Sequence, residues 1–134
     1  MTSPEPSPNE LELLKALWRG GRASAREVHE AAGAPLGWSY STTRTVLSRM
    51  VEKGLVTRGE FHGLTLFEAK PKKVEMIGRM VRDFARRVLE SDTALPASAF
   101  TGSSLLNEAE IEELERLLAE DETAKRGESG ETEQ

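Results

Sequence analysis

The sequence predicts a mainly α-helical chain with one small β-hairpin. Three short helical patterns stand in series before residue 54, and each is followed by glycine. After Gly54 the hydrophobic spacing changes from 3.6 to 2 residues, and two β-prone runs flank a His-Gly pair. From Pro71 the helical spacing returns in two further segments. This order predicts a winged helix-turn-helix followed by a helical dimerisation domain.

The expected organisation has four parts. A Pro- and Ser-rich stretch is predicted to be disordered, and so is an acidic tail, because neither can bury enough apolar surface to order itself. The winged domain and the helical domain lie between them. The expected boundaries are 1–6 for the first stretch, 7–71 for the winged helix-turn-helix, 72–121 for the dimerisation domain and 122–134 for the tail.

Two capping boxes open the first two helices. Ser7 and Glu10 form one box, and Ser24 and Glu27 form the other, since a hydroxyl three residues before a glutamate satisfies two free backbone N–H groups. The first helix is expected to end at residues 20–21 and to place Trp18 in the core. The second helix is short, and we expect His29 on its surface.

The third helix is expected to run from near Ser41 to Gly54. Its apolar stripe is Val46, Leu47, Met50 and Val51. If that stripe faces the core, the opposite face is free to contact DNA bases and phosphates. The predicted DNA-binding residues on and before this helix are Ser39, Ser41, Thr42, Arg44, Thr45, Ser48 and Arg49; those of the hairpin are Arg58 and His62.

The fourth helix carries apolar residues at alternating steps of three and four, which is typical of a helix that packs along another helix. Gly78 interrupts it, as a close approach of a partner backbone would allow. A short helical turn is expected at residues 97–100, and Asn107 and Glu110 cap a final helix. The predicted dimerisation residues are Val74, Ile77, Val81, Phe84, Val88, Ile111, Leu114, Leu117 and Leu118.

Charged residues are distributed unevenly along the chain. Residues 1–73 carry 11 Lys+Arg and 8 Asp+Glu (net +3), whereas residues 74–134 carry 7 and 15 (net −8). A local basic face can bind DNA on an acidic protein, because salt screens distant charges within about 10 Å. On charge alone, ordinary surface variation is the favoured explanation of the net +3.

Several function classes are disfavoured. There is no cysteine and only two histidines, so no disulfide or thiolate metal site exists and no cofactor is expected. No catalytic constellation and no Gly-rich phosphate loop is present, so we expect no enzyme. No basic and apolar leader and no apolar run of about 18 residues is found. A cytoplasmic protein without membrane insertion is therefore expected.

Residues 9–67 resemble the DNA-binding domain of the penicillinase-repressor (BlaI/MecI/CopY) family of transcriptional regulators. The resemblance extends over roughly residues 7–121, including the E-L-E-L-L-K-A-L-W opening and the L-L-N-E-A-E-I-E-E-L stretch. The family's third-helix pattern, W-x-Y-[TS]-T-x-[KR]-T-x-x-x-R-[LM]-x-x-K-G, is matched by Trp38, Tyr40, Ser41, Thr42, Arg44, Thr45, Arg49, Met50, Lys53 and Gly54.

The resemblance implies a homodimeric repressor that binds inverted repeats in double-stranded DNA. In antibiotic-resistance members a membrane sensor upstream leads to cleavage between an Asn and a Phe. That junction aligns with Ala99 and Phe100. Because the Asn is missing there, cleavage at this junction is not predicted. Copper-responsive members carry cysteine pairs, which this chain lacks.

Two other classes remain open from sequence. A winged-helix adaptor would bind protein through the same surface and show no salt-dependent affinity for DNA. A small-molecule sensor would hold a ligand between the two domains.

Overall fold

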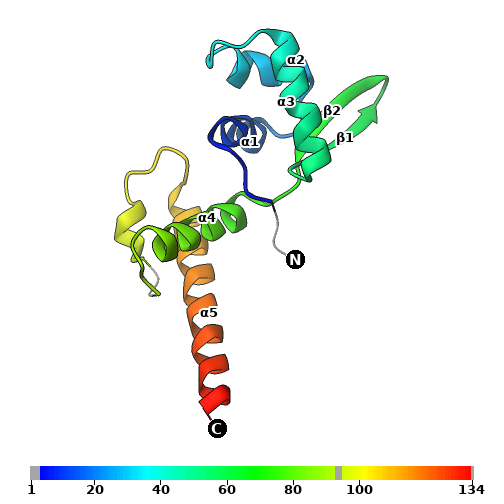
Figure 1. Ribbon diagram of the computed structural model, residues 1–134. Coiled ribbons are helices and arrows are strands. Elements are labelled where there is room, and N and C mark those ends of the chain that lie inside the picture. Colours follow the sequence, from blue (N-terminus) through cyan, green and yellow to red (C-terminus); the bar gives the residue numbers. More distant parts are fainter. Residues whose placement is uncertain (1–3, 93–94, 134) are drawn as a thin grey trace. The chain divides into compact units, whose positions relative to one another are not determined.

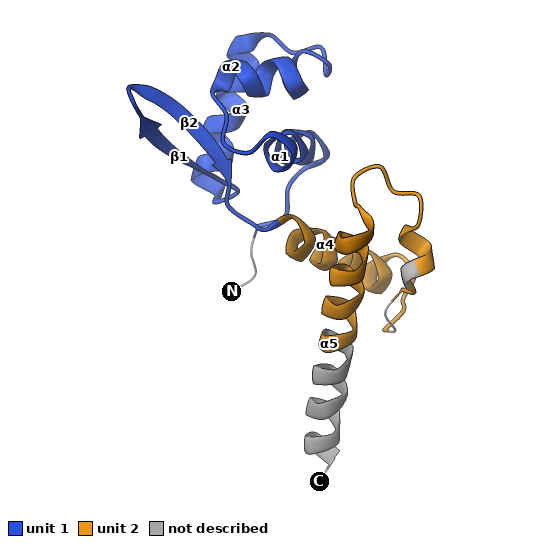
Figure 2. Ribbon diagram, turned by 180° about the vertical axis from the view of Figure 1, so that it is seen from behind, with its two compact units in different colours: residues 1–72 blue, residues 73–134 orange. Residues whose placement is uncertain are grey.

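The computed structural model describes residues 4–92 and 95–133, and the chain forms two compact units, residues 1–72 and 73–134 (Figure 2). The division falls beside the domain boundary expected after residue 71. Of the N-terminal stretch expected to be disordered, residues 1–3 lie outside the described residues. Residues 4–6 have no regular secondary structure, and Pro6 is buried.

Unit 1 combines three α-helices with a two-stranded antiparallel sheet in its described residues, as the sequence predicts (Figure 1). A π-helical turn continues the second helix. The elements are α1 (Pro8–Gly20), α2 (Ala25–Val28), η1 (His29–Gly33), α3 (Tyr40–Lys53), β1 (Val56–Phe61) and β2 (Leu64–Ala69).

Both predicted capping boxes are present at the helix starts. The Ser7 side chain accepts a hydrogen bond from the Glu10 backbone N–H at 3.2 Å, and Glu10 Oε1 accepts one from the Ser7 N–H at 2.8 Å. Ser24 and Glu27 repeat the arrangement at 3.1 and 2.9 Å. Each box satisfies backbone donors that the first turn leaves free, which fixes where α1 and α2 begin.

The core of unit 1 forms where the helices meet the base of the hairpin. Buried side chains come from every element of the unit, and the most deeply buried include Leu13, Leu14, Leu17, Val28, Leu47, Met50, Leu55 and Val56. Trp18, expected in this core, is only half-buried, because its Nε1 donates to the Pro71 carbonyl oxygen at 3.1 Å. An indole at the edge of a core can bury its ring and still satisfy its N–H.

The hairpin also makes an isolated β-bridge that the sequence did not indicate. Val56 pairs with Ala69 and Phe61 with Leu64 in an antiparallel register. Ala23, which precedes α2, forms a β-bridge with Phe67 through two backbone hydrogen bonds of 3.0 and 2.7 Å. The bridge ties the start of α2 to the hairpin and holds the two elements side by side.

Unit 2 contains α4 (Lys73–Arg87), the 3-10 helix η2 (Ala97–Phe100) and α5 (Glu108–Glu133). The turn predicted at residues 97–100 is confirmed, and Asn107 caps α5 as predicted, its Oδ1 accepting from the Glu110 N–H at 2.8 Å. The C-terminal ends of two helices differ from expectation. Helix α4 ends before Val88, and α5 continues past Asp121, because strong helix formers such as Glu, Ala, Lys and Arg follow it.

The core of unit 2 forms between α4 and α5. Val74, Leu106, Leu114 and Leu118 are buried together, with partly buried apolar side chains around them. Gly78 makes this approach close: a Cβ at this position would lie 3.3 Å from Leu114 Cδ1. We had expected Gly78 to admit the backbone of a partner, but it faces a side chain of the chain's own α5.

Candidate nucleic-acid interface

Helix α3 buries one face in unit 1 and exposes the other. Thr43, Leu47 and Met50 are each 0% exposed, at helical spacing. The helix begins at Tyr40, one residue before the predicted start, because the Ser39 side chain accepts from the Thr42 N–H at 3.2 Å. All of the predicted DNA-reading side chains on this helix are exposed, namely Ser41, Thr42, Arg44, Thr45, Ser48 and Arg49.

The buried face of this helix differs at its borders from the predicted apolar stripe. Val46 and Val51, expected in the apolar stripe, are half-buried because they lie at its borders, while the buried Thr43 occupies a core position that the stripe omitted. A threonine is acceptable there because its hydroxyl has partners within the protein. Its methyl group packs as a small apolar side chain.

Local hydrogen bonds engage part of the exposed hydroxyl set. Ser39 Oγ lies 3.0 Å from Thr42 Oγ1, and the Thr45 hydroxyl donates to the Ser41 carbonyl oxygen at 3.1 Å. Such local bonds compete with contacts to a ligand. Within the described residues, the hydroxyls of Ser41 and Ser48 make no such bond, so they are the more available ones.

The hairpin presents its predicted residues at the surface. Arg58 on β1 is exposed, with its Cζ 5.7 Å from the centre of the Phe67 ring. His62 and Gly63 form the turn with φ values of 51° and 81°, the pair of positive φ angles that a tight two-residue hairpin turn requires. The sequence predicted this for Gly63 only. His62 is exposed at the tip of the turn.

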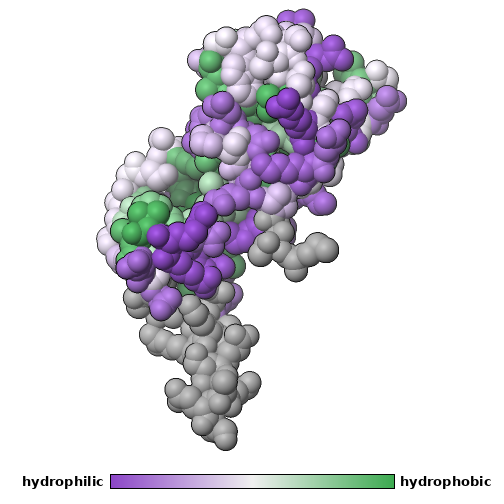
Figure 3. All heavy atoms as spheres, viewed as in Figure 1, coloured by the Kyte–Doolittle hydropathy of each residue, from purple (hydrophilic) through white to green (hydrophobic). Residues whose placement is uncertain are grey.

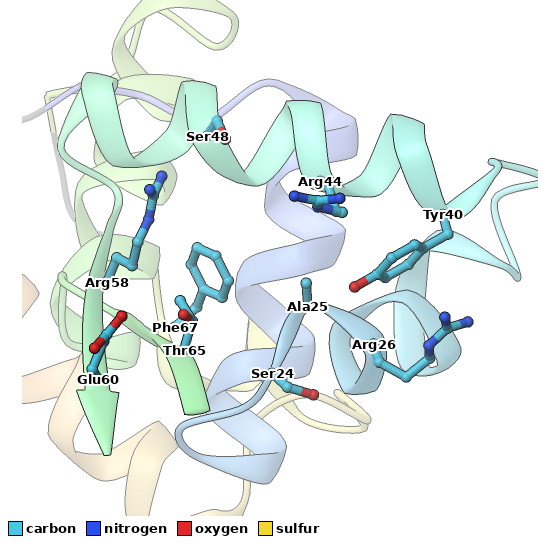
Figure 4. Close-up of a pocket in the computed structure, with 10 residues that line it drawn as sticks. All are labelled: Ser24, Ala25, Arg26, Tyr40, Arg44, Ser48, Arg58, Glu60, Thr65 and Phe67. Atoms are coloured by element: carbon cyan, nitrogen blue, oxygen red, sulfur yellow. The ribbon is translucent and has the colours of Figure 1, made fainter. Parts of the chain in front are cut away.

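A cleft of about 420 Å³ lies between α2, α3 and the hairpin (Figure 4). Arg44 and Ser48 of α3 and Arg58 of β1 line it, as predicted members of the interface. Seven further residues line it that the sequence did not assign to the interface, among them Arg26 and Tyr40. Arg26 belongs to a different helix, and its place beside Tyr40 depends on the tertiary fold, so no spacing in the sequence indicates it.

The Tyr40 ring packs against His29, which is hydrogen-bonded to Thr43. The Tyr40 ring meets the His29 ring edge-on, with centroids 5.6 Å apart and planes at 75°. His29 Nδ1 lies 2.8 Å from Thr43 Oγ1, which in turn donates to the Ser39 carbonyl oxygen at 3.5 Å. We had expected His29 on the surface of α2. It is instead half-buried, because the π-helical turn places it against α3.

An ion pair joins the end of α3 to the first turn of α1. Lys53 Nζ, at the end of α3, lies 2.7 Å from Glu10 Oε1 in the first turn of α1. Burial tends to raise the pKa of Glu10, but the hydrogen bond from Lys53, that from the Ser7 N–H and the positive charge of Lys53 outweigh it. The pKa of Glu10 is therefore lowered, and the pair holds α3 against α1.

The predicted dimerisation residues fall into two groups. Val74, Leu114 and Leu118 are buried within unit 2 itself, with Ile77, Val81, Ile111 and Leu117 partly buried around them. Phe84 is 49% exposed, Val88 is 62% exposed and the adjacent Leu89 is 52% exposed. In the space-filling view a hydrophobic patch lies on unit 2 around the end of α4 and η2 (Figure 3).

The described residues offer neither a metal-ion site nor a membrane-spanning helix. No group of three or more His, Cys, Asp or Glu side chains is placed to hold a metal ion in that part of the chain. None of its helices is both long enough and apolar enough to cross a bilayer.

Comparison with known proteins gives the chain a family. The model of the family described as penicillinase repressor matches residues 6–120. The chain belongs to the penicillinase repressor family. It is 25% identical over 114 residues to the methicillin resistance regulatory protein MecI of Mammaliicoccus sciuri, covering 85% of this chain and 93% of that protein. It is 24% identical over 123 residues to the penicillinase repressor of Bacillus licheniformis, covering 92% and 96%.

A solved structure also matches. It is that of BpsR from Bordetella bronchiseptica, whose DNA binding 6-hydroxynicotinic acid regulates. Sequence identity is 24%, the TM-score is 0.47, and the match covers 85% of this chain and 73% of that one.

The structure explains several positions of the third-helix motif in this member of the family. Tyr40 opens α3 and supports Arg44, whose Cζ lies 5.9 Å from the ring centre. Lys53 pairs with Glu10 at the other end of the helix. Gly54 follows with φ 87°, the left-handed conformation that ends a helix at low cost in glycine. The motif therefore combines exposed side chains with residues that hold the helix in place.

Proposed function

We propose that this chain is a transcriptional repressor that binds a palindromic operator in double-stranded DNA as a homodimer and performs no catalysis. The observation that carries the proposal is the exposed face of α3. Arg44 and Arg49 are exposed opposite the buried Thr43, Leu47 and Met50, so the helix can lie in a major groove without losing its core contacts. The names of the relatives, a regulatory protein and a repressor, support it.

The two arginines have different proposed roles. Arg44, in the second turn of α3, is the base-reading residue, since a guanidinium can donate two hydrogen bonds to guanine O6 and N7. Arg49 lies further along the helix and binds phosphate. Hydroxyls of the same face and Arg58 and His62 of the hairpin complete the interface by positioning the DNA backbone.

The homodimer is supported by the exposed apolar group at the end of α4. Phe84, Val88 and Leu89 together leave more apolar surface in water than scattered single residues do, and a second copy of the chain would cover it. A two-fold dimer presents two copies of α3 to DNA, and a palindromic site follows from that symmetry. Cytoplasmic location is part of the same proposal, because the DNA is there.

A salt titration tests the function. Fluorescence anisotropy is measured on the duplex directly upstream of the coding region and on a scrambled duplex, from about 50 to about 300 mM salt. We expect Arg44→Ala to lose the preference for the upstream duplex by roughly tenfold or more. Arg49→Ala should weaken both duplexes about equally and reduce the salt slope by about one.

The outcomes separate the alternatives. Equal behaviour of the two variants contradicts the division of roles between Arg44 and Arg49. A wild-type protein without salt-dependent affinity for either duplex contradicts the DNA-binding function and favours the winged-helix adaptor.

A further inference from the structure

The cleft between α2, α3 and the hairpin gathers three arginines from three elements. Arg26 comes from α2, Arg44 from α3 and Arg58 from β1, and among the residues that line the cleft only Glu60 is acidic (Figure 4). Elements far apart in the sequence thus place positive charge around one hollow. Like charges brought together cost free energy unless an anion compensates them, so this arrangement points to an anionic occupant.

All three guanidinium groups are supported by aromatic rings. Arg26 Cζ lies 4.2 Å and Arg44 Cζ 5.9 Å from the centre of the Tyr40 ring, and Arg58 Cζ lies 5.7 Å from that of Phe67. A cation–π contact orients a guanidinium but uses none of its five N–H donors. Among the described residues no carboxylate forms an ion pair with any of the three, so their donors remain available to a ligand.

Tyr40 is the shared support of two of these arginines. Figure 4 shows its ring between Arg26 and Arg44. The edge contact with His29 and the His29–Thr43 hydrogen bond hold the ring from the protein side. Because these contacts restrain the ring, the Arg26 guanidinium that stacks on it is held in place beside the cleft. This reduces the entropy lost on binding.

We propose that this cleft holds one backbone phosphate of the operator, and that Arg26 is a phosphate-binding residue with Tyr40 as its positioning residue. The inference rests on the proposed function and extends it to α2. The occupant is a DNA phosphodiester because the cleft lies between α3 and the hairpin, the two elements proposed to flank the DNA backbone. A guanidinium matches two phosphate oxygens with two parallel N–H donors, and Arg26 acts without regard to base sequence.

The chain offers a matched control for Arg26. Arg22 is also exposed and stacks on a hairpin ring, its Cζ 4.0 Å from the centre of Phe61, but it does not line the cleft. We expect Arg26→Gln to lower the affinity for the upstream duplex and for a scrambled duplex by the same factor, roughly five- to thirtyfold. The slope of log affinity against log salt should fall by about 0.9. Arg22→Gln should leave that slope unchanged.

Neutral phosphate substitutions locate the contact. One methylphosphonate at a time replaces a phosphate along each strand of the upstream duplex. We expect one position per half-site to weaken the wild-type protein but to have no further effect on Arg26→Gln, because the charge pair is already lost. In Arg22→Gln the same position should weaken binding as it does in the wild type.

Tyr40 and Glu60 provide independent readouts. Tyr40→Phe keeps the ring and should retain the wild-type salt slope, whereas Tyr40→Leu should lower it as Arg26→Gln does, with an unchanged circular dichroism spectrum as the check on folding. Glu60→Gln removes the one negative charge at the cleft and should strengthen binding to both duplexes severalfold at low salt.

Three results would overturn the inference. One is an unchanged salt slope in Arg26→Gln while the wild type binds the upstream duplex, which leaves the proposed function intact. Another is a methylphosphonate effect that is fully additive with Arg26→Gln at every position. The third is a free anion as occupant: inorganic phosphate, titrated by calorimetry, binds the wild type but not Arg26→Gln, while duplex affinity is the same for both. Loss of all duplex binding by the wild type would instead refute the proposed function.

Discussion

Thr43 shows how a single buried hydroxyl links two helices. It is 0% exposed, and its Oγ1 lies 2.8 Å from His29 Nδ1 and 3.5 Å from the Ser39 carbonyl oxygen. A buried polar group is tolerated only when it is hydrogen-bonded. Its partners are the residue that supports Tyr40 and the residue that caps α3, so one hydroxyl helps to fix both the start of the helix and the ring beside it.

Gly33 makes room for this hydrogen bond. A Cβ at that position would overlap Thr43 Oγ1 and lie 2.7 Å from His29 Nδ1. We therefore expect Gly33→Ala to reduce the free energy of unfolding by about 1–3 kcal/mol, as overpacking in a core does. Urea denaturation followed by circular dichroism measures it.

Gly20→Ala is the matched control for Gly33. Nothing lies within 4 Å of a Cβ at Gly20, at the end of α1. The control should be neutral or slightly stabilising, since alanine favours the helix over glycine by up to about 1 kcal/mol. The role assigned to Gly33 fails if both alanine variants unfold at the same urea concentration.

At the scale of elements, the sequence specified most of what is local. The helix starts at Ser7, Ser24 and Asn107 could be predicted because each cap and its glutamate lie three residues apart and interact within one turn. The hairpin followed from a change of spacing and a His-Gly pair. The exposed face of α3 followed from its apolar stripe, because a helix can bury only one face.

The sequence did not reveal contacts between distant segments. The bridge between Ala23 and Phe67, the place of Arg26 over Tyr40 and the burial of His29 against Thr43 each join residues of different elements. No periodicity encodes such pairs, since they depend on how the helices pack. The cleft went unpredicted for the same reason. Its lining comes from two helices and two strands, and only Arg44 and Ser48 of α3 and Arg58 of β1 had local signals.

The ion pair between Glu10 and Lys53 predicts a pH dependence of the fold. The pKa of Glu10 is lowered in the folded state, so the carboxylate contributes stability above its unfolded pKa of about 4.5. That contribution is lost as the pH falls through the lower folded-state pKa. The pair is partly exposed, so its contribution is about 1 kcal/mol or less.

Thermal unfolding between about pH 7 and pH 3 measures this effect. Glu10→Gln should lower the midpoint at neutral pH and approach the wild-type midpoint at the acid end. Glu12→Gln is the control, because Glu12 pairs with Lys15 on the same helix at 2.8 Å and does not join α1 to α3. If Glu10→Gln and the wild type differ by the same amount at every pH, the ion pair is not responsible.

For the whole molecule, the division of charge matches the division into units. Unit 1, residues 1–72, carries 10 Lys+Arg and 8 Asp+Glu (net +2), whereas unit 2, residues 73–134, carries 8 and 15 (net −7). The cationic side chains of α2, α3 and β1 can therefore act on DNA locally while the chain as a whole stays acidic. Unit 2 has its own apolar core and also exposes apolar side chains at the end of α4.

The exposed apolar group of unit 2 provides the test of the homodimer. Phe84 and Val88 are 49% and 62% exposed, and each large apolar side chain that a partner covers contributes about 1.5–3 kcal/mol. We expect Phe84→Glu combined with Val88→Glu to raise the dimer dissociation constant by roughly a hundredfold or more, measured by sedimentation equilibrium. Operator affinity should fall as the dimer dissociates, because a monomer engages one half-site.

Leu64→Glu is the control. It adds a charge to an exposed leucine, at 61%, on the hairpin of unit 1, and it should leave the association state unchanged. A double variant that remains dimeric, or a wild type that sediments as a monomer at micromolar concentration, would exclude this group as the dimer contact. The proposed palindromic operator would then lose its geometric basis.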